Sequence, residues 1–477
     1  MYTKLALFID GEWIEETGAG SEVVLNPATE EALGTLPHAG KAELDRALAA
    51  ASRSFESWKR TSPYERGQIL RRAAGLMRER LDHIATVLTL EEGKTFAEAK
   101  GEITAAAEFF DWFAEEGRRS YGRVIPARLA DMTQTVTQEP VGPVACFTPW
   151  NFPAVTPARK IAPALAAGCT CIIKPAEETP GTTLEIARAL ADAGLPNGVL
   201  NVVFGVPGEV SEYLIRSPII RKISFTGSTA VGRHLARLAG ETLTLATMEL
   251  GGHAPVIVAK DADIRRAAEV SMAIKLRNTG QVCTSPTRFF VERPVYEEYL
   301  EYARQFVEKQ VVGSGLKAET TVGPVANSRR VDAMDDLIAD AVSHSARVIT
   351  GGGRMKGPGL MYRPTVLADV PDRAKAMSHE PFGPLALVQP VDGIDQALER
   401  ANALPYGLAG YAFTSSSVTA KRISDEMAVG VIGINQMVVT IPETPFGGIG
   451  DSGWGREGGV EGLEGYTVRK YVGHLHI

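Results

Sequence analysis

The amino-acid sequence predicts an α/β protein with two doubly wound, Rossmann-like domains and a small additional β element. Three observations predict it: the length of 477 residues, a repeated alternation of short apolar runs with helical stretches, and one alternating segment outside this rhythm. At about 100 to 200 residues per domain, the length allows two to four domains, each with its own core. Hydrophobic residues make up 44% and charged residues 22%, which excludes disordered and fibrous proteins.

The first third of the chain is predicted to be mainly helical. Apolar residues recur at steps of three or four residues between 44 and 58 and between 103 and 113, the spacing of a buried helix face. Between them, Ser62 and Glu65 form a capping box that begins another helix. From 122 to 140 the pattern changes to alternation, which predicts an extended hairpin.

A β-α rhythm follows. Short apolar runs separated by helical stretches lie at residues 144–147, 170–173, 199–203, 222–225 and 245–248. Their starts are about 25 residues apart, which predicts parallel strands joined by crossover helices. A second alternation begins at Pro255, with expected strands at 288–291, 347–350, 385–388, 409–413 and 431–434. Two doubly wound sheets are therefore expected.

Charge and cysteine content exclude several classes of function. The 50 Lys and Arg residues are outnumbered by 57 Asp and Glu residues and form no basic run, so neither nucleic acid nor an anionic membrane is an expected partner. No apolar stretch of membrane-spanning length and no signal peptide can be identified. Four cysteines are too few for a disulfide scaffold, and a reducing, cytoplasmic location is expected.

Polar and glycine residues gather where the strands of the first sheet are predicted to end, the edge at which open α/β sheets bind ligands. They are Trp150 with Asn151, Lys174 with Glu177, Gly205, Gly227 with Ser228, and Glu249 with Leu250. The segment from Gly227 to Gly232 leads into a helix whose first amides can face a phosphate, although Ser228 can also simply cap that helix. The G-x-G-x-x-G match at 448–453 lacks the following helix and acidic residue, so a flexible glycine-rich loop is expected there.

Cys283 is the candidate nucleophile, because it lies in a turn where a helical stretch ends and Pro286 follows. The other three cysteines lie in or beside apolar strands and are expected to be packing residues. No metal site is predicted, since no Cys or His pairs have zinc spacing. Glu249 can act as a general base or be an ion-paired glutamate, and Asn151 can donate to an oxyanion or be a turn residue.

Taken together, these residues resemble the NAD(P)-dependent aldehyde dehydrogenase superfamily over essentially the whole chain. The matching motifs, in the family's order, are Pro149-Trp-Asn-Phe-Pro153, Lys174-Pro-Ala-Glu177, Phe225-Thr-Gly-Ser-Thr229, Glu249-Leu-Gly-Gly252, Gly280-Gln-Val-Cys283, Glu380-Pro-Phe-Gly-Pro384 and Pro445-Phe-Gly-Gly448. The resemblance implies that Cys283 attacks the aldehyde, that Asn151 holds the oxyanion, and that Glu249 activates the water that hydrolyses the thioester. Glu249 also argues against the CoA-acylating branch.

The resemblance further implies the cofactor site. It places Lys174 and Glu177 at the adenosine ribose, Ser228 at the pyrophosphate, and Glu380 with Phe382 near the nicotinamide ribose. The remaining expected cofactor residues are Trp150, Gly205, Gly227, Gly232 and Leu250. A carboxylate at position 177 accepts both ribose hydroxyls but repels a 2′-phosphate, so NAD is expected to be preferred, with NADP possible.

The substrate is expected to carry a carboxylate. Arg159 and Arg277 match the carboxylate-binding arginines of succinate-semialdehyde and 2-oxoglutarate-semialdehyde dehydrogenases, with Thr440 and Phe152 beside the substrate. The alternative is a general oxidiser of uncharged aldehydes, in which both arginines face solvent. Ser285 replaces a second cysteine of the succinate-semialdehyde group, so thiol-disulfide regulation is not expected.

The resemblance also implies the domain organisation and a homodimer or homotetramer. The expected units are an NAD-binding domain of residues 1–121 and 141–251, a catalytic domain of residues 252–450, and an oligomerisation element of residues 122–140 and 451–477.

Overall fold

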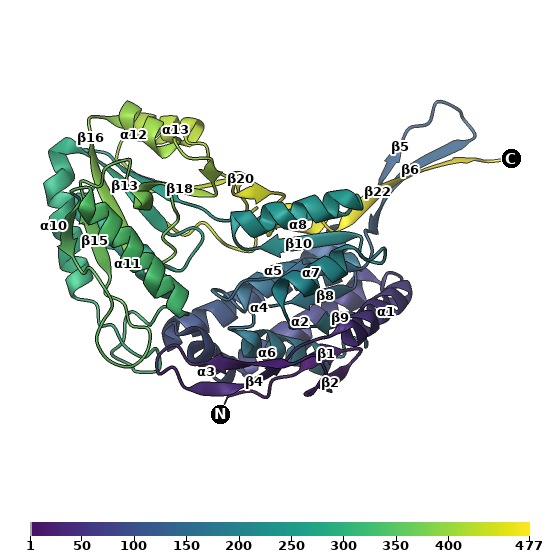
Figure 1. Cartoon of the computed structure of the whole chain (residues 1–477). Coiled ribbons are helices and arrows are strands. Elements are labelled where there is room, and N and C mark those ends of the chain that lie inside the picture. The colour runs from purple at the N-terminus through teal and green to yellow at the C-terminus, as the bar shows by residue number, and fades with distance from the viewer. Residues whose placement is uncertain (1) are drawn as a thin grey trace.

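A computed structural model of the chain describes residues 2–477, and two large β-sheets organise it (Figure 1). The first sheet has the strand order β2-β1-β9-β8-β7-β10-β11-β21. Its strands are β1 (Leu7–Ile9), β2 (Glu12–Ile14), β7 (Val144–Phe147), β8 (Cys171–Lys174), β9 (Leu200–Val202), β10 (Lys222–Thr226), β11 (Leu245–Glu249) and β21 (Gly453–Trp454). Strands β7 to β11 are parallel, as predicted. The chain winds outward from β7 in both directions, so β7 and β10 flank the switch point where such sheets bind ligands.

Helices surround this sheet. They are α1 (Lys41–Trp58), α2 (Pro63–Glu79), α3 (Leu81–Glu92), α4 (Phe96–Glu116), α5 (Val155–Ala167), α6 (Pro180–Asp192), α7 (Pro207–Ile215) and α8 (Thr229–Glu241). Ser62 caps α2 through the predicted capping box with Glu65, and Thr95 caps α4 in the same way with Glu98. The apolar faces of these helices and the sheet share one hydrophobic core.

The first 40 residues differ from the predicted helical pattern, because four short strands precede α1. Strands β3 (Ser21–Leu25) and β4 (Ala32–Pro37) form a separate antiparallel pair, while β1 joins the edge of the main sheet through Phe8 and Val202. Strand β1 depends on β9, nearly 200 residues away, whereas β2 pairs with β1 and β3 pairs with β4. None of the four belongs to the regular β-α alternation from which the other strands were predicted.

The second sheet has the order β14-β15-β16-β13-β12-β18-β19, with β14 antiparallel to its neighbour. Its strands are β12 (Ala254–Val258), β13 (Pro286–Glu292), β14 (Arg347–Thr350), β15 (Thr365–Ala368), β16 (Leu385–Val391), β18 (Ala409–Phe413) and β19 (Val431–Ile434). The helices of this domain are α9 (Ile264–Leu276), α10 (Tyr296–Glu308), α11 (Ser328–Ser343), α12 (Ile394–Ala401) and α13 (Ser417–Glu426). All five strands predicted for this half are present.

A three-stranded arm projects from the body of the molecule (Figure 1). It consists of β5 (Arg123–Ile125), β6 (Met132–Pro140) and β22 (Thr467–Leu475), with β22 paired along the whole of β6. The hairpin predicted at 122–140 is thus present. Within the predicted range 451–477, however, β21 belongs to the first sheet and α14 (Gly459–Glu464) packs on α5, so only the last part of that range reaches the arm.

The glycine-rich segment that follows Gly447 is ordered, which corrects the expectation of a flexible loop. Its strand β20 (Ile449–Gly450) pairs with β17 (Tyr406–Gly407), and Ser452 donates from Oγ to the carbonyl of Gly251 at 2.7 Å. A Cβ at Gly453 would overlap the carbonyl oxygen of Met248. The glycines therefore serve close backbone packing rather than mobility.

The two sheets meet so that the carboxyl edge of the first faces the amino edge of the second. Strand β11 ends at Glu249, and residues 250–253 alone connect it to β12. Cys283 lies just before β13, at the amino edge of the second sheet. This connection brings the candidate base and the candidate nucleophile to one cleft. Among residues 2–477, no helix is both long and apolar enough to cross a membrane.

Candidate active site

One cavity of about 790 Å³ is lined by residues of both domains. The predicted site residues that line it are Trp150, Asn151, Phe152, Arg159, Gly227, Ser228, Glu249, Leu250, Arg277, Cys283, Glu380, Phe382 and Thr440. Four predicted cofactor residues lie outside this lining, namely Lys174, Glu177, Gly205 and Gly232. The residues predicted for chemistry and for the substrate thus share one space.

Cys283 is partly exposed in this cavity. Burial of the thiol raises its pKa to about 12, and the carboxylates of Glu380 and Glu249 act in the same direction, while Arg159 opposes them. The resting sulfur therefore carries its proton. Attack on a carbonyl requires a base to receive that proton.

Asn151 is buried and its amide is oriented by hydrogen bonds. Its Nδ2 donates to the carbonyl oxygen of Gln281 at 2.9 Å. The backbone carbonyl oxygen of Asn151 accepts hydrogen bonds from Lys94 Nζ and from Asn278 Nδ2, both at 2.9 Å. The amide predicted to bind an oxyanion is thus tied to the loop that carries Cys283.

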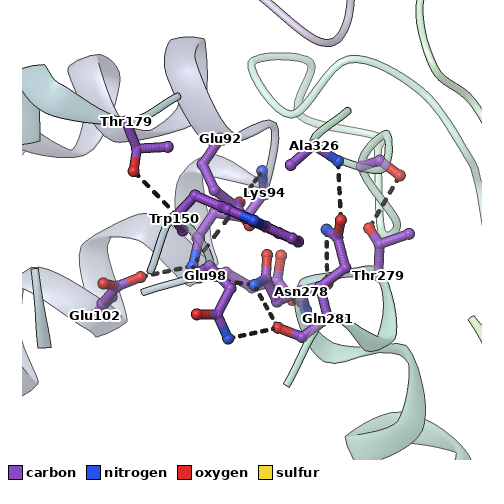
Figure 2. A network of polar contacts seen from close by, with 12 residues as sticks. Glu92, Lys94, Glu98, Glu102, Trp150, Thr179, Asn278, Thr279, Gln281 and Ala326 are labelled. Carbon is purple, nitrogen blue, oxygen red and sulfur yellow. Dashed lines mark hydrogen bonds and ion pairs between the residues drawn. The ribbon is translucent and has the colours of Figure 1, made fainter. Parts of the chain in front are cut away.

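A polar network that the sequence did not reveal includes Lys94, Glu98, Glu102 and Asn278 (Figure 2). Lys94 and Asn278 bond the backbone carbonyl of Asn151 and hold it in place. Lys94 Nζ also contacts Glu102 at 2.6 Å, and the other oxygen of Glu102 accepts the backbone N–H of Ala154 at 2.8 Å, at the start of α5. Glu98 accepts the backbone N–H of Asn278 at 2.8 Å. Glu98 and Glu102 lie one turn apart on α4, and this spacing was the signal available in the sequence.

The loop before Cys283 has an unusual backbone. Asn278 and Thr279 have φ values of 49° and 53°, in the left-handed region, which is strained for non-glycine residues. The hydroxyl of Thr279 donates to the carbonyl of Gly323 at 3.0 Å, and Gln281 accepts the N–H of Ala326 at 2.8 Å. These bonds fix the loop in the conformation that turns Cys283 towards the cavity.

Glu249 is buried at the end of β11, and among residues 2–477 neither of its carboxylate oxygens has a hydrogen-bond partner. Burial raises its pKa well above the usual range, and the negative charge of Glu457 adds to this effect. Glu457, which the sequence did not suggest, lines the same cavity and lies 2.5 Å from Lys160 Nζ. A Cβ at Gly447 would lie 2.7 Å from Glu249 Oε1, so this glycine makes room for the carboxylate.

Arg159 and Arg277 both line the cavity, and within residues 2–477 neither forms an ion pair. The guanidinium of Arg159 lies 4.4 Å from the ring centroid of Phe446 and is buried, with no hydrogen-bond partner for Nε. Arg277 is exposed and lies 5.2 Å from the ring of Phe152. Two cations without acidic partners favour an anion in this part of the cavity.

The predicted phosphate-binding turn has the geometry of a helix cap. Ser228 accepts the backbone N–H of Val231 at 3.4 Å at the start of α8, while its side chain also lines the cavity. A Cβ at Gly232 would overlap the side chain of Leu250, so this glycine serves packing. Ser228 can cap α8 and still lie beside a bound phosphate, because other backbone amides at the start of α8 remain available to that phosphate.

The other cofactor residues fall into two groups. Lys174 is ion-paired with Glu177 after β8, and burial raises the pKa of Glu177. Glu380 accepts the backbone N–H of Gly252 at 3.2 Å, and a Cβ at Gly251 would lie 2.8 Å from its second oxygen. Gly251 therefore leaves space beside Glu380, and the free oxygen of Glu380 can accept a hydrogen bond from a ribose hydroxyl.

Comparison with known proteins gives one consistent result. The aldehyde dehydrogenase family model matches residues 13–472. A 4-(hydroxymethyl)benzenesulfonate dehydrogenase of Comamonas testosteroni is 47% identical over 475 residues, which cover 100% of this chain and 99% of the relative. A succinate-semialdehyde dehydrogenase of Escherichia coli, named as NADP-dependent, is 42% identical over 97% of this chain and 96% of its own. The crystal structure of an Escherichia coli NADP-dependent enzyme superposes with a TM-score of 0.97 at 41% identity, covering 99% and 98% of the two chains.

Proposed function

The chain belongs to the aldehyde dehydrogenase family, and we propose that it oxidises a short aldehyde that carries a carboxylate at its far end. The observation that carries this proposal is the presence of Arg159 and Arg277, without acidic partners, in the cavity that holds Cys283. A planar guanidinium binds a carboxylate through two parallel hydrogen bonds. Succinate semialdehyde and 2-oxoglutarate semialdehyde are the proposed substrates.

A sulfonate-bearing aldehyde is the second candidate. It is favoured by the relative from Comamonas testosteroni, whose name specifies a benzenesulfonate substrate and which is 47% identical to this chain. A sulfonate has the same single charge as a carboxylate and one more oxygen, so the same arginines can bind it. The third possibility, an uncharged aldehyde, would leave the buried Arg159 without a partner for its Nε.

In the proposed reaction, the thiol of Cys283 gives up its proton to solvent water in the cavity, and Sγ attacks the aldehyde carbon to form the anion of a thiohemiacetal. The resulting oxyanion is bound by Asn151 Nδ2 and by the backbone N–H of Cys283. A nicotinamide cofactor, when bound, would supply the hydride acceptor that oxidation of the thiohemiacetal to a thioester requires. The carbonyl of Gln281 holds the side-chain amide of Asn151, and the buried network holds the backbone carbonyl of Asn151, so little reorganisation is needed when the negative charge develops.

Hydrolysis of the thioester is assigned to Glu249. Its two free oxygens can accept a proton from water, and the water oxygen then attacks the acyl carbon and releases Cys283. A raised pKa makes the carboxylate a stronger base than a solvated glutamate. The product is the free acid.

The cofactor is proposed to be NAD in preference to NADP. The amides at the start of α8 would hold the pyrophosphate, and Glu380 would accept a ribose hydroxyl, with Trp150 and Phe382 as apolar walls at a ring separation of 5.5 Å. The preference rests on Glu177, whose carboxylate would repel a 2′-phosphate. The NADP-dependent relatives make this preference a point for measurement.

The domain roles and the assembly are also proposed. The two sheet domains would bind the cofactor and carry Cys283, respectively. The arm exposes apolar side chains on strands with free edges, including Val468, Tyr471 and Leu475, and such an arm is suited to pairing with a second copy of the chain.

The substrate proposal is tested by catalytic efficiencies over one panel. It contains succinate, glutarate and 2-oxoglutarate semialdehydes, a sulfonate-bearing benzaldehyde and hexanal, each with NAD and with NADP. We expect kcat/KM for the best carboxylate semialdehyde to exceed that for hexanal by about 100-fold, the effect of one charge-assisted bidentate contact. A higher value for the sulfonate selects the second candidate, and equal values for all would reject both anionic proposals.

A further inference from the structure

Helix α4 forms one wall of the cavity, and two small residues lie in the middle of that wall. The residues of α4 that line the cavity are Glu98, Gly101, Glu102, Ala105, Glu108 and Phe109. They recur every three or four residues, which places them on one face of the helix. Gly101 and Ala105 therefore lie along this face between Glu98, near the start of the helix, and Phe109.

Gly101 has no packing role that explains it. Outside its own turn of helix, a Cβ at this position would meet no atom of residues 2–477 within 4 Å. Gly67 in α2 differs, because a Cβ there would lie 2.7 Å from the carbonyl oxygen of Ala114. Glycine in the middle of a helix makes the helix less stable than alanine does. The space beside Gly101 and Ala105, which we call the open part of the wall, is thus left free for a ligand.

The open part of the wall lies between the surroundings of the two arginines of the cavity. Glu98 Oε1 accepts the backbone N–H of Asn278 at 2.8 Å, next to Arg277. The ring centroid of Phe109 lies 5.0 Å from the guanidinium of Arg159. Arg159 has 9% of its surface exposed, and within residues 2–477 its Nε has no hydrogen-bond partner. The open part of the wall and both arginines therefore face one continuous space.

The remaining lining of this space includes aromatic and aliphatic side chains. Phe152 and Phe446 line it, each with an arginine over its ring. Val438 and Ile441 also line it, with 66% and 44% of their surfaces exposed. A ligand with an apolar body would remove these side chains from water, which is favourable. The space thus suits a flat apolar group that carries an anion.

We propose that the enzyme also oxidises aromatic aldehydes with one anionic group, and that Gly101 and Ala105 determine this specificity by leaving room for the ring. The ring would contact the apolar lining, and its anionic group would bind to the arginines. In the reaction, the aldehyde carbon loses a hydride to NAD and gains the oxygen of water, which gives the carboxylic acid and releases one proton. The inference rests on the proposed oxidation of anionic aldehydes at Cys283.

Two matched substrates isolate the effect of the ring. Succinate semialdehyde and 4-formylbenzoate each have one aldehyde and one carboxylate, and they differ only in the spacer, which is two methylene groups or a phenylene ring. We expect kcat/KM of the wild type for 4-formylbenzoate to be at least about one tenth of that for succinate semialdehyde, since the space for the ring is already present. 4-Formylbenzenesulfonate, measured beside it, shows whether a sulfonate serves as the anionic group. NADH formation is the readout.

Gly101→Leu tests where the ring lies. Leucine favours a helix and its Cβ meets no neighbour, so the variant should have an equal or higher Tm. Its side chain would occupy the open part of the wall. We expect kcat/KM for the better aromatic aldehyde to fall by about 10 to 100-fold, the usual effect of forcing extra methylenes into an occupied space, and that for succinate semialdehyde to change by less than about threefold.

Gly75→Leu in α2 is the matched control. A Cβ at Gly75 also meets nothing within 4 Å among residues 2–477, and Gly75 does not line the cavity. This variant gains the same helix propensity, so its Tm should also be equal or higher, while both substrates keep their kcat/KM. Ala105→Leu should act in the same direction as Gly101→Leu, because both positions border the open part of the wall.

The outcomes separate this inference from the proposed function. If succinate semialdehyde is oxidised and both aromatic aldehydes stay below about one tenth of its kcat/KM, this inference alone is overturned. If none of the three anionic aldehydes is oxidised, the proposed function is rejected as well. Equal losses for the aromatic and the aliphatic substrate in Gly101→Leu would also overturn the inference, because the residue would then serve the site as a whole and not the ring.

Discussion

Asn151 donates from Nδ2 to the carbonyl oxygen of Gln281 at 2.9 Å, so the proposed oxyanion donor is joined to the nucleophile's own loop. Gln281 precedes Cys283 by two residues, and the two segments come from different domains. The amide nitrogen carries two hydrogens, so the bond to Gln281 leaves the second hydrogen for an incoming aldehyde oxygen. The site is thus assembled by the contact between domains rather than by either domain alone.

Replacement of Asn151 by Ala should lower kcat by about 10² to 10³, because one oxyanion donor is removed while Cys283 and the cofactor residues remain. Steady-state kinetics and NAD binding by fluorescence titration measure the two effects separately. A variant that binds NAD normally and keeps full kcat would remove Asn151 from the mechanism.

Cys283→Ser should abolish aldehyde oxidation, because a serine hydroxyl lacks the nucleophilicity of a thiol and forms no thioester. Cys169→Ser is a matched control, since Cys169 is buried outside the cavity and its sulfur donates to a backbone carbonyl at 3.4 Å, which a hydroxyl can also do. NADH formation at 340 nm is the measurement. Substantial turnover by Cys283→Ser would contradict the nucleophile assignment.

Glu249→Gln should retain a burst of NADH and lose steady-state turnover by about 100-fold, because the acyl-enzyme forms but water is no longer activated. Stopped-flow absorbance resolves the burst. If burst and steady state fell together, Glu249 would act before the thioester rather than after it.

The acid limb of the pH profile of the hydrolysis rate should move to lower pH in the variant Glu457→Gln. Glu249 must be ionised to accept a proton, so the hydrolysis rate rises with pH through its pKa. The charge of Glu457 raises that pKa, and removing it lowers the pKa. Single-turnover hydrolysis over pH 5 to about 9 gives the limb, and an unchanged limb would mean that Glu457 has no influence on the base.

Gly447→Ala should reduce turnover by about tenfold or more, because the new Cβ would lie 2.7 Å from Glu249 Oε1 and displace the carboxylate. Gly240→Ala in α8 is the matched control, since a Cβ there meets nothing within 4 Å. The control should keep full activity and an equal or higher Tm. Equal activity of the two variants would show that the space beside Glu249 is not critical.

The sequence predicts most of this fold because its parallel strands are apolar runs that alternate regularly with helical stretches. Strands β1 to β4 escaped prediction because they lie outside this alternation, and only β1 depends on a distant partner, Val202. The glycine-rich segment was interpreted as flexible because close backbone packing, as at Gly453, leaves the same composition as a mobile loop.

The candidate site was predictable where chemistry requires a particular residue type, as for Cys283 and Glu249. The supporting residues were not. Glu92, Lys94 and Glu102 look like ordinary charges at the end of one helix and the start of the next, and only the tertiary structure buries them together. Their role depends on contacts that the fold brings together, such as that between Lys94 and Glu102, and sequence spacing carries no record of those contacts.

The ratio of kcat/KM for succinate semialdehyde to that for hexanal, compared between the wild type and Arg277→Ala, tests the central claim most directly. Arg266→Ala is the matched control, because Arg266 is exposed on α9 and does not line the cavity. We predict that the ratio falls by about 10 to 100-fold in Arg277→Ala and is unchanged in Arg266→Ala, since only the anionic substrate loses a contact. A ratio that stays constant in Arg277→Ala would contradict the binding of an anionic aldehyde by this arginine.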